Sequence, residues 1–318
     1  MRKLGCIPTN KFVTDVSLIA DMLHSIKKNQ TSVLMYPEAS YSFDGCATPL
    51  PKKLGVLIKK LGVPVITVIT EGAFLRDPLY NGLQKRRVRV TAQVNCLFSR
   101  QEIEQLSAEE LSSQLESVFT FDNFATQRDN KIPITESFRA DGLERILYRC
   151  ANCGCEEKME GIGTQITCHN CHKSYTLDIY GQLKAASGKT EFSHIPDWYA
   201  WERQCVKEEL EKGKYLLDIP VEIAVLKDFR AIYKVGEGRL VHSSEGFKLT
   251  GCNGRLEYTQ SPTASYGLYA DYFWYEIADV ICIGDKKQLY YCFPKQKTNV
   301  AKARLAAEEL YNNYATKK

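Results

Sequence analysis

The chain has 318 residues, of which 44% are hydrophobic and 25% are charged, and its formal net charge is +4. The length fits two or three domains. The proportions are ordinary for a globular protein and argue against a wholly disordered chain. The weak positive charge lacks the strongly basic signature of a nucleic-acid-binding protein. It is compatible with anionic substrates or with a membrane surface.

The sequence lacks signals for a membrane span or for secretion. Its most apolar stretch, residues 56–75, is interrupted by Lys59, Lys60 and Glu71, so no helix is expected to span a membrane. The first residues do not form the apolar core of a signal peptide. Twelve cysteines in such a chain indicate reduced thiols or metal ligands rather than disulfides. We expect a cytoplasmic protein, either free or peripheral on the inner face of the membrane.

Residues 1–135 show alternating strand and helix patterns. The expected elements are a helix capped by Thr14, a buried strand over Ser32–Tyr36, an amphipathic helix over residues 53–61, a strand covered on both faces over residues 63–69, a strand near the sheet edge over residues 86–94, and a helix opened by the capping box of Ser107 and Glu110. Such alternation predicts an α/β domain built on a mainly parallel sheet.

Residues 136–185 carry the clearest motif of the chain. Two Cys-x-x-Cys pairs, Cys150 with Cys153 and Cys168 with Cys171, are separated by fourteen residues. The intervening segment predicts a hairpin around Gly161 and Gly163, which would bring the pairs together as a closed four-sulfur site. The spacing predicts a zinc ribbon with structural Zn²⁺. Four unligated thiols and a redox role are the alternatives, and Cys155, His169 and His172 are spare donors nearby.

Residues 186–215 predict a helical connector. Trp198, Trp201 and Val206 share one side of this helix, which we expect to pack on a neighbouring domain rather than on a membrane interface.

Residues 216–318 predict a small β-barrel-like domain of the pleckstrin-homology type with a C-terminal helix from Asn299. Seven short strand patterns, "VEIAVL", "AIYKV", "GRLVH", "GFKLT", "RLEYT", "FWYEIADVICIG" and "QLYYCF", are separated by turn residues. The aromatic residues of the segment 266–275 are expected to pack in the core of this domain, with a ligand platform as the alternative.

The N-terminal region also resembles the phospholipid acyltransferase family that acylates lysophosphatidic acid. "YPE" (Tyr36, Pro37, Glu38) matches the start of the family's Phe-Pro-Glu-Gly-Thr-Arg block, and "VPVI" from Val63 matches its Val-Pro-Ile-Ile-Pro-Val block. Upstream, "GCIPTNK" is similar to the Gly-x-x-Phe-Ile-x-Arg block. The zinc ribbon and β-rich tail resemble a bacterial subgroup of the family.

The resemblance implies a set of acceptor-binding residues at the carboxyl ends of strands, where open α/β sheets bind ligands. These residues are Gly5, Lys11, Tyr36, Pro37, Glu38, Ser40 and Tyr41, with Val63 and Pro64 in a structural role. Lys11 stands where the family has arginine and would supply positive charge to a glycerol phosphate, without arginine's bidentate fork. A tight turn that requires only Pro37 and Gly45 is the alternative interpretation of "YPEASYS".

The family's acid–base unit, His-x-x-x-x-Asp, is absent from this sequence. None of the five histidines is followed five positions later by aspartate, and the arginine expected near Ser40 or Tyr41 is missing. We therefore assign no catalytic residue. If the resemblance holds, the His-Asp pair comes from an upstream segment or from another chain.

The sequence thus predicts an incomplete acyltransferase-type α/β domain, a zinc ribbon and a β-barrel-like domain. The expected function is acyl transfer from acyl-CoA or acyl carrier protein to lysophosphatidic acid or a related glycerolipid, inactive in the isolated chain. The alternative is a non-enzymatic module that binds a lipid headgroup or a protein. Nucleic acid is not expected as a partner.

Overall fold

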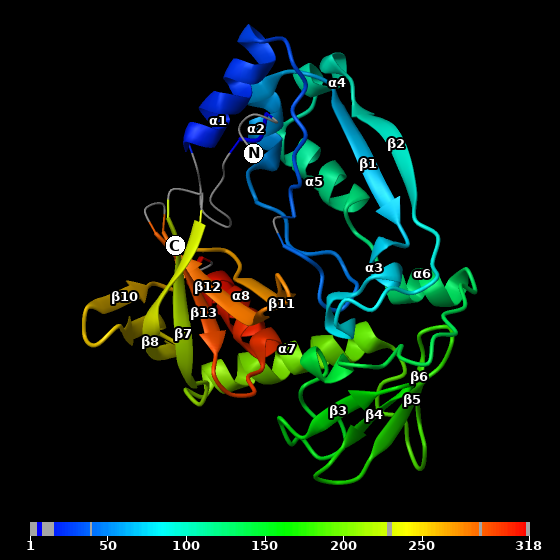
Figure 1. Ribbon diagram of the computed structural model, residues 1–318. Helices are drawn as coiled ribbons and strands as arrows, with labels where there is room; N and C mark the ends of the chain where they lie inside the picture. Colours follow the sequence, from blue (N-terminus) through cyan, green and yellow to red (C-terminus); the bar gives the residue numbers. More distant parts are fainter. Residues whose placement is uncertain (1–4, 8–15, 39, 228–230, 286–287, 316–318) are drawn as a thin grey trace.

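The structure is a computed structural model that describes residues 5–7, 16–38, 40–227, 231–285 and 288–315. Three parts follow one another along the chain: an N-terminal region of helices with a two-stranded sheet, a four-stranded ribbon, and a seven-stranded sheet with a C-terminal helix (Figure 1). Helix α7 (Ile195–Glu211) extends from the ribbon to the seven-stranded sheet. The pairings of all three sheets are antiparallel.

The N-terminal region is mainly helical. Its elements are α1 (Val16–Leu23), the π-helix η2 (His24–Lys28), α2 (Leu54–Leu61), β1 (Val65–Glu71), α3 (Ala73–Arg76), η3 (Leu79–Asn81), β2 (Thr91–Phe98), α4 (Arg100–Gln105), α5 (Ala108–Val118), α6 (Asn123–Asp129) and η4 (Leu143–Arg145). The capping box at the start of α5 is confirmed, because the Ser107 side chain accepts from the Glu110 N–H and the Glu110 carboxylate accepts from the Ser107 N–H.

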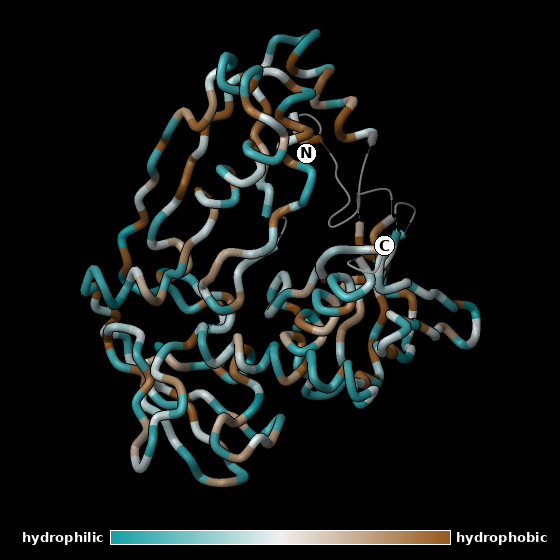
Figure 2. Tube along the Cα trace, turned by 180° about the vertical axis from the view of Figure 1, so that it is seen from behind, coloured by the Kyte–Doolittle hydropathy of each residue, from teal (hydrophilic) through white to brown (hydrophobic). Residues whose placement is uncertain are grey.

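The expectation of a parallel sheet in this region is wrong. Strands β1 and β2 form a two-stranded antiparallel sheet in which Val68 lies opposite Val94. The side chains of Ile66, Val68 and Val94 are more than half exposed, so the strand is not covered on both faces. Figure 2 shows hydrophobic stretches along β1 and β2. Among the described residues no further strand pairs with either edge, and a parallel neighbour is therefore missing.

The predicted buried strand over Ser32–Tyr36 is also wrong. These residues are assigned to no strand, and the side chains of Leu34 and Tyr36 are 75% and 81% exposed. A single strand cannot satisfy its backbone groups without a neighbour, so an apolar run of this length forms no strand when no sheet accepts it.

The strand predicted over residues 86–94 begins only at Thr91, because Arg86 has a different role. The Arg86 side chain is buried, and its guanidinium donates to the Asn81 side chain (3.0 Å), the Tyr80 hydroxyl (2.8 Å) and the Arg139 carbonyl (2.8 Å). This buried arginine ties the chain before β2 to the segment that leads into the ribbon, and alternation alone did not reveal it.

The ribbon consists of β3 (Met159–Ile162), β4 (Gln165–Cys168), β5 (Ser174–Leu177) and β6 (Leu183–Ala185), paired in that order. Strands β3 and β4 form the predicted hairpin. Its tip is Gly163 and Thr164, and Gly163 has a φ of +66°, which glycine adopts without strain.

The C-terminal part contains β7 (Leu217–Lys227), β8 (Ala231–Ser243), β9 (Gly246–Gly251), β10 (Leu256–Gln260), β11 (Tyr269–Trp274), β12 (Ala278–Gly284), β13 (Leu289–Pro294) and α8 (Val300–Ala315). The strand order is β10-β9-β8-β7-β13-β12-β11. The expectation of a barrel is wrong in this respect: the outer strands β10 and β11 do not pair with each other, so the sheet is open.

Two strand boundaries differ from the prediction for local reasons. "AIYKV" and "GRLVH" belong to one strand, β8, because Gly236 lies at a bulge opposite Ile223 instead of in a turn. The long pattern "FWYEIADVICIG" is split between β11 and β12 by a turn in which Tyr275 and Glu276 have positive φ angles.

The packing predictions for the aromatic residues are largely confirmed. Trp198 and Val206 on α7 are fully buried, and the Trp198 indole N–H donates to the Arg149 carbonyl at 3.0 Å. Tyr272 and Trp274 are buried in the C-terminal part, whereas Tyr275 is 79% exposed. None of the helices in the described part of the chain has the length and apolar character required to span a bilayer.

Candidate metal centre

The two Cys-x-x-Cys segments meet because the β3–β4 hairpin folds the second segment back onto the first. Cys168 is the last residue of β4 and lies opposite Met159, the first residue of β3. The first pair lies in the turn that precedes β3, and the second pair begins at the end of β4 and ends with Cys171 in the turn between β4 and β5. The two pairs, separated by fourteen residues, are thereby placed at one end of the ribbon.

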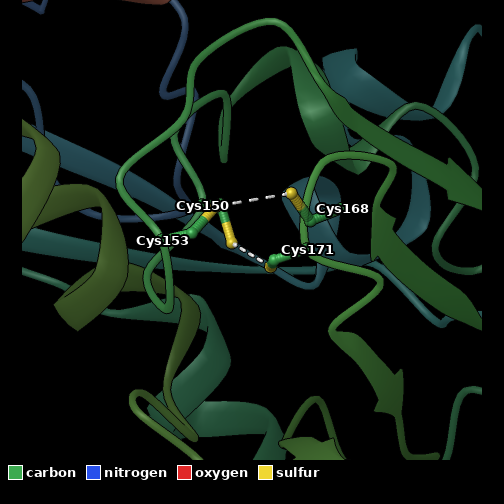
Figure 3. Close-up of side chains that lie close together, drawn as sticks. All are labelled: Cys150, Cys153, Cys168 and Cys171. Atoms are coloured by element: carbon green, nitrogen blue, oxygen red, sulfur yellow. Dashed lines mark hydrogen bonds between the residues drawn. The ribbon is translucent and has the colours of Figure 1, made fainter.

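The four sulfur atoms converge on one point (Figure 3). All lie within 4.8 Å of one another; the Cys150–Cys171 Sγ atoms are 3.7 Å apart and the Cys153–Cys168 Sγ atoms are 3.8 Å apart. Four sulfurs arranged as a tetrahedron at about 2.3 Å from a metal would be about 3.8 Å apart. The thiols are thus spaced as ligands of one ion, and this donor set can hold a metal.

The two turns have the same backbone structure. In the first turn the Gly154 N–H donates to the Cys150 carbonyl at 2.8 Å, and in the second the His172 N–H donates to the Cys168 carbonyl, also at 2.8 Å. Gly154 and His172 both have positive φ angles, +73° and +59°. Equivalent turns around both pairs present the cysteines from two sides of the site.

Each turn also contributes an asparagine that sequence reasoning missed. The Asn152 side chain donates to the Cys171 Sγ at 3.4 Å, and the Asn170 side chain donates to the Cys153 Sγ at 3.6 Å. Each asparagine therefore reaches the second cysteine of the opposite turn. The signal was present in the sequence, since both motifs read Cys-x-Asn-Cys.

The electrostatics of the site favour a thiolate at Cys171. Burial raises the pKa of Cys150 and of Cys168, although backbone N–H groups of their own turns donate to both sulfurs. At Cys171 burial also acts to raise the pKa, but hydrogen bonds from the Asn152 side chain and the Lys173 N–H lower it to about 6. A cation at the centre is the remaining element that would stabilise four thiolates together.

The spare donors lie outside the cluster of four. The Cys155 thiol donates to the Glu156 carbonyl at 3.6 Å. The His169 ring nitrogen Nε2 lies 2.7 Å from the Glu160 carboxylate on the exposed surface. Among the described residues, the cluster of possible metal ligands does not include Cys155, His169 or His172.

The acceptor-binding residues expected from the resemblance do not form a cluster like that of the four cysteines. Gly5 and Tyr36 are exposed, Lys11 lies outside the described residues, and Val63 and Pro64 form the connection between α2 and β1. Glu38 follows Pro37 in a turn, and its carboxylate accepts from the Thr48 hydroxyl at 3.3 Å. Partial burial raises the pKa of Glu38 despite this hydrogen bond.

Ser40 and Tyr41 are held by a residue that the sequence did not single out. The guanidinium of Arg304, on α8, donates to the Ser40 hydroxyl at 3.1 Å and to the Tyr41 carbonyl at 2.7 Å. Arg304 is buried and also donates to the Glu308 carboxylate at 3.0 Å. The turn after Glu38 is therefore anchored on the C-terminal helix.

A small cavity adjoins the turn that contains Ser40. This cavity, lined by Ser40, Pro49, Arg304 and residues 266–268, provides about 10 Å³, which is the room of a single water molecule.

Comparison of the chain with protein-family models, with curated proteins and with solved structures finds no match in any of the three.

Proposed function

We propose that Cys150, Cys153, Cys168 and Cys171 bind one structural Zn²⁺ ion. The observation that carries this proposal is the spacing of the sulfur atoms, 3.7 and 3.8 Å across the two pairs, which is the spacing of tetrahedral zinc thiolates. Side-chain amides and backbone N–H groups that donate to the sulfurs support it further, because such donors stabilise the charged thiolate over the thiol.

The role is structural because four cysteines complete the coordination of zinc. Catalytic zinc sites keep one position for water or substrate, and this requires a set of three protein ligands. Here the fourth thiol, Cys171, is as close to the cluster as the others. The ion would cross-link the turn that precedes β3 to the end of β4 and the turn that follows it, and folding of the ribbon would depend on it.

Elemental analysis of the purified full-length chain tests the proposal. We expect about one zinc per chain, and we expect the four cysteines to resist alkylation until a chelator is added. Free alkylation of all four thiols in protein that contains no zinc would refute the site.

A second candidate function is acyl transfer from an acyl thioester to a lysophospholipid or a glycerol phosphate. It is supported by the three ordered sequence blocks and by the anchoring of the Pro37–Glu38 turn, in which Thr48 and Arg304 fix Glu38 and Ser40. In this proposal the acid–base pair is supplied from outside the residues of this chain. Because the cavity beside Ser40 is small, acceptor binding would require the turn to open.

Titration of the full-length chain with lysophosphatidic acid tests this second candidate. Saturable binding that is weakened about tenfold or more by Lys11→Ala would support an acceptor site, since a charge-assisted hydrogen bond to phosphate contributes about 1.5–3 kcal/mol. Binding that Lys11→Ala leaves unchanged would favour the alternative, a headgroup-binding module in the C-terminal part. Absence of binding would refute both.

A further inference from the structure

Four charged side chains form a closed ring beside the cysteine cluster. Going round the ring, Arg149 lies 3.4 Å from Glu156, Glu156 lies 2.9 Å from Lys302, Lys302 lies 2.7 Å from Glu209, and Glu209 lies 2.8 Å from Arg149. Each charge therefore contacts two charges of opposite sign. The four side chains are between 20% and 25% exposed, so solvent screens them less than it screens surface pairs.

The ring joins three parts of the chain that are distant in sequence. Arg149 and Glu156 flank the first cysteine turn, Glu209 lies in the last turn of α7, and Lys302 lies in the first turn of α8. A groove of about 540 Å³ opens beside the ring, and all four members of the ring line it. The ring is thus a direct link between the ribbon and α8.

The two ribbon members of the ring depend on the conformation of the cysteine turn. Arg149 immediately precedes Cys150, and Glu156 immediately follows Cys155. Their backbones are paired as an isolated bridge, which is closed by the hydrogen bond from the Cys150 N–H to the Cys155 carbonyl at 2.9 Å. Opening the turn would separate Glu156 from Arg149 and move the Glu156 carboxylate away from Lys302.

Helix α7 holds the same point of the ribbon independently of these side chains. The Arg149 N–H donates to the buried Glu202 carboxyl at 2.8 Å, and the Arg149 carbonyl accepts from Trp198. Contact between α7 and the ribbon can therefore persist when the turn opens. Glu156 contacts α8 through the Lys302 side chain, and just before the helix the Lys297 side chain donates to the Met159 carbonyl of β3 at 3.5 Å.

We propose that metal binding at the four cysteines and docking of α8 on the ribbon are coupled through this ring. The inference rests on the metal site proposed above and adds its consequence for the rest of the molecule. With the ion bound, the first turn is closed and Glu156 holds Lys302. Without the ion the turn opens, and α8 loses this anchor. By reciprocity, a chain that lacks the Lys302 contact binds the metal more weakly.

The first test measures zinc affinity by competition with a chromogenic chelator. Lys302→Met is expected to weaken zinc binding about fivefold to thirtyfold, within the usual range of coupling between two sites. The matched control is Lys212→Met, which removes a lysine of the same groove; among the described residues, Lys212 forms an ion pair with the exposed Glu208 of α7. The control corrects for the loss of a positive charge near thiolates. The zinc affinity of Lys212→Met should stay within about twofold of that of the unmodified chain.

The second test measures amide hydrogen exchange of the unmodified chain with zinc and after zinc removal, so it does not depend on the folding of a variant. We expect amides of the first turns of α8 to exchange about tenfold faster without zinc, while those of β12 and β13 are unchanged. A chain that binds no zinc would overturn the metal site and the coupling together. One zinc bound equally well by all three proteins, with α8 unaffected by its removal, would overturn the coupling alone.

Discussion

The ribbon and the N-terminal region were predicted from the same sequence with opposite success. In the ribbon, the hairpin and the meeting of the two cysteine pairs are found as expected. In the N-terminal region, the parallel sheet is absent among the described residues, and the segment 32–36 forms no strand. The two regions differ in the sequence separation between a strand and the strand with which it must pair. The ribbon closes within about twenty residues, whereas a parallel strand needs a neighbour from a distant part of the chain.

The largest effect is expected from breaking the ribbon itself. Cys168→Ser removes a buried ligand and should abolish stoichiometric zinc binding, since the free energy of zinc binding is also the folding free energy of such a site. Zinc content after gel filtration measures the loss. Cys155→Ser is the matched control, because its thiol lies outside the cluster, and it should retain one zinc per chain. Equal zinc content in both variants would contradict the assignment of ligands.

A smaller effect is expected where the N-terminal turn meets α8. Arg304→Met would leave the buried Glu308 carboxylate with Arg203 as its remaining cationic partner in the network, and the Ser40 and Tyr41 contacts would be lost. The expected cost is about 3 kcal/mol in the free energy of unfolding, measured by urea denaturation. Arg128→Met removes an exposed pair with Asp129 and should cost less than about 0.5 kcal/mol. Similar values for the two variants would show that Arg304 does not anchor the turn.

The pair of His194 and Asp122, which joins the start of α7 to the start of α6, predicts a pH dependence. Their atoms Nε2 and Oδ2 are 2.7 Å apart. The hydrogen bond to Asp122 raises the pKa of His194 although burial opposes this, and the pKa of Asp122 is lowered by the same contact against the effect of burial. A raised histidine pKa contributes stability that is complete below its ordinary value of 6.5 and is lost as pH rises through the folded value.

The lowered pKa of Asp122 contributes stability above its ordinary value of 3.8, which is lost as pH falls through the folded value. The window of full stabilisation is therefore bounded by 3.8 and 6.5. His194→Gln should lower the free energy of unfolding by about 1 kcal/mol near the middle of this window and by less at higher pH. Denaturation at several pH values measures this. His169→Gln, in an exposed pair, is the control, and a penalty for His194→Gln that grows with pH would contradict the sign.

The smallest effect is expected in the segment that was wrongly predicted to be a buried strand. Leu34→Ser should change the free energy of unfolding by less than about 0.5 kcal/mol, because the side chain is 75% exposed. The same substitution at a buried strand position would cost about 3 kcal/mol. Leu111→Ser, at a buried position of α5, should show such a value. A large effect at Leu34 would show that the segment is covered by a partner.

The features that could be predicted from the sequence are those whose contacting residues lie close together in the chain. The capping box joins Ser107 and Glu110, which are three positions apart, and each Cys-x-Asn-Cys turn is equally local. By contrast, Arg304 and Ser40 are 264 positions apart, and no local pattern distinguishes a buried arginine such as Arg86 from one on an exposed strand. The ion-pair ring at Arg149 belongs to the same class, since its members come from three separate parts of the chain.

X-ray absorption at the zinc edge tests the central claim most directly, because it reports the type and distance of the atoms bound to the ion. For the purified full-length chain we predict four sulfur ligands at about 2.3 Å and no nitrogen or oxygen ligand. The prediction rests on the four Sγ atoms, which lie within 4.8 Å of one another and include two pairs at 3.7 and 3.8 Å. A shell with a nitrogen or oxygen atom in place of a sulfur, or protein that takes up no zinc, would contradict it.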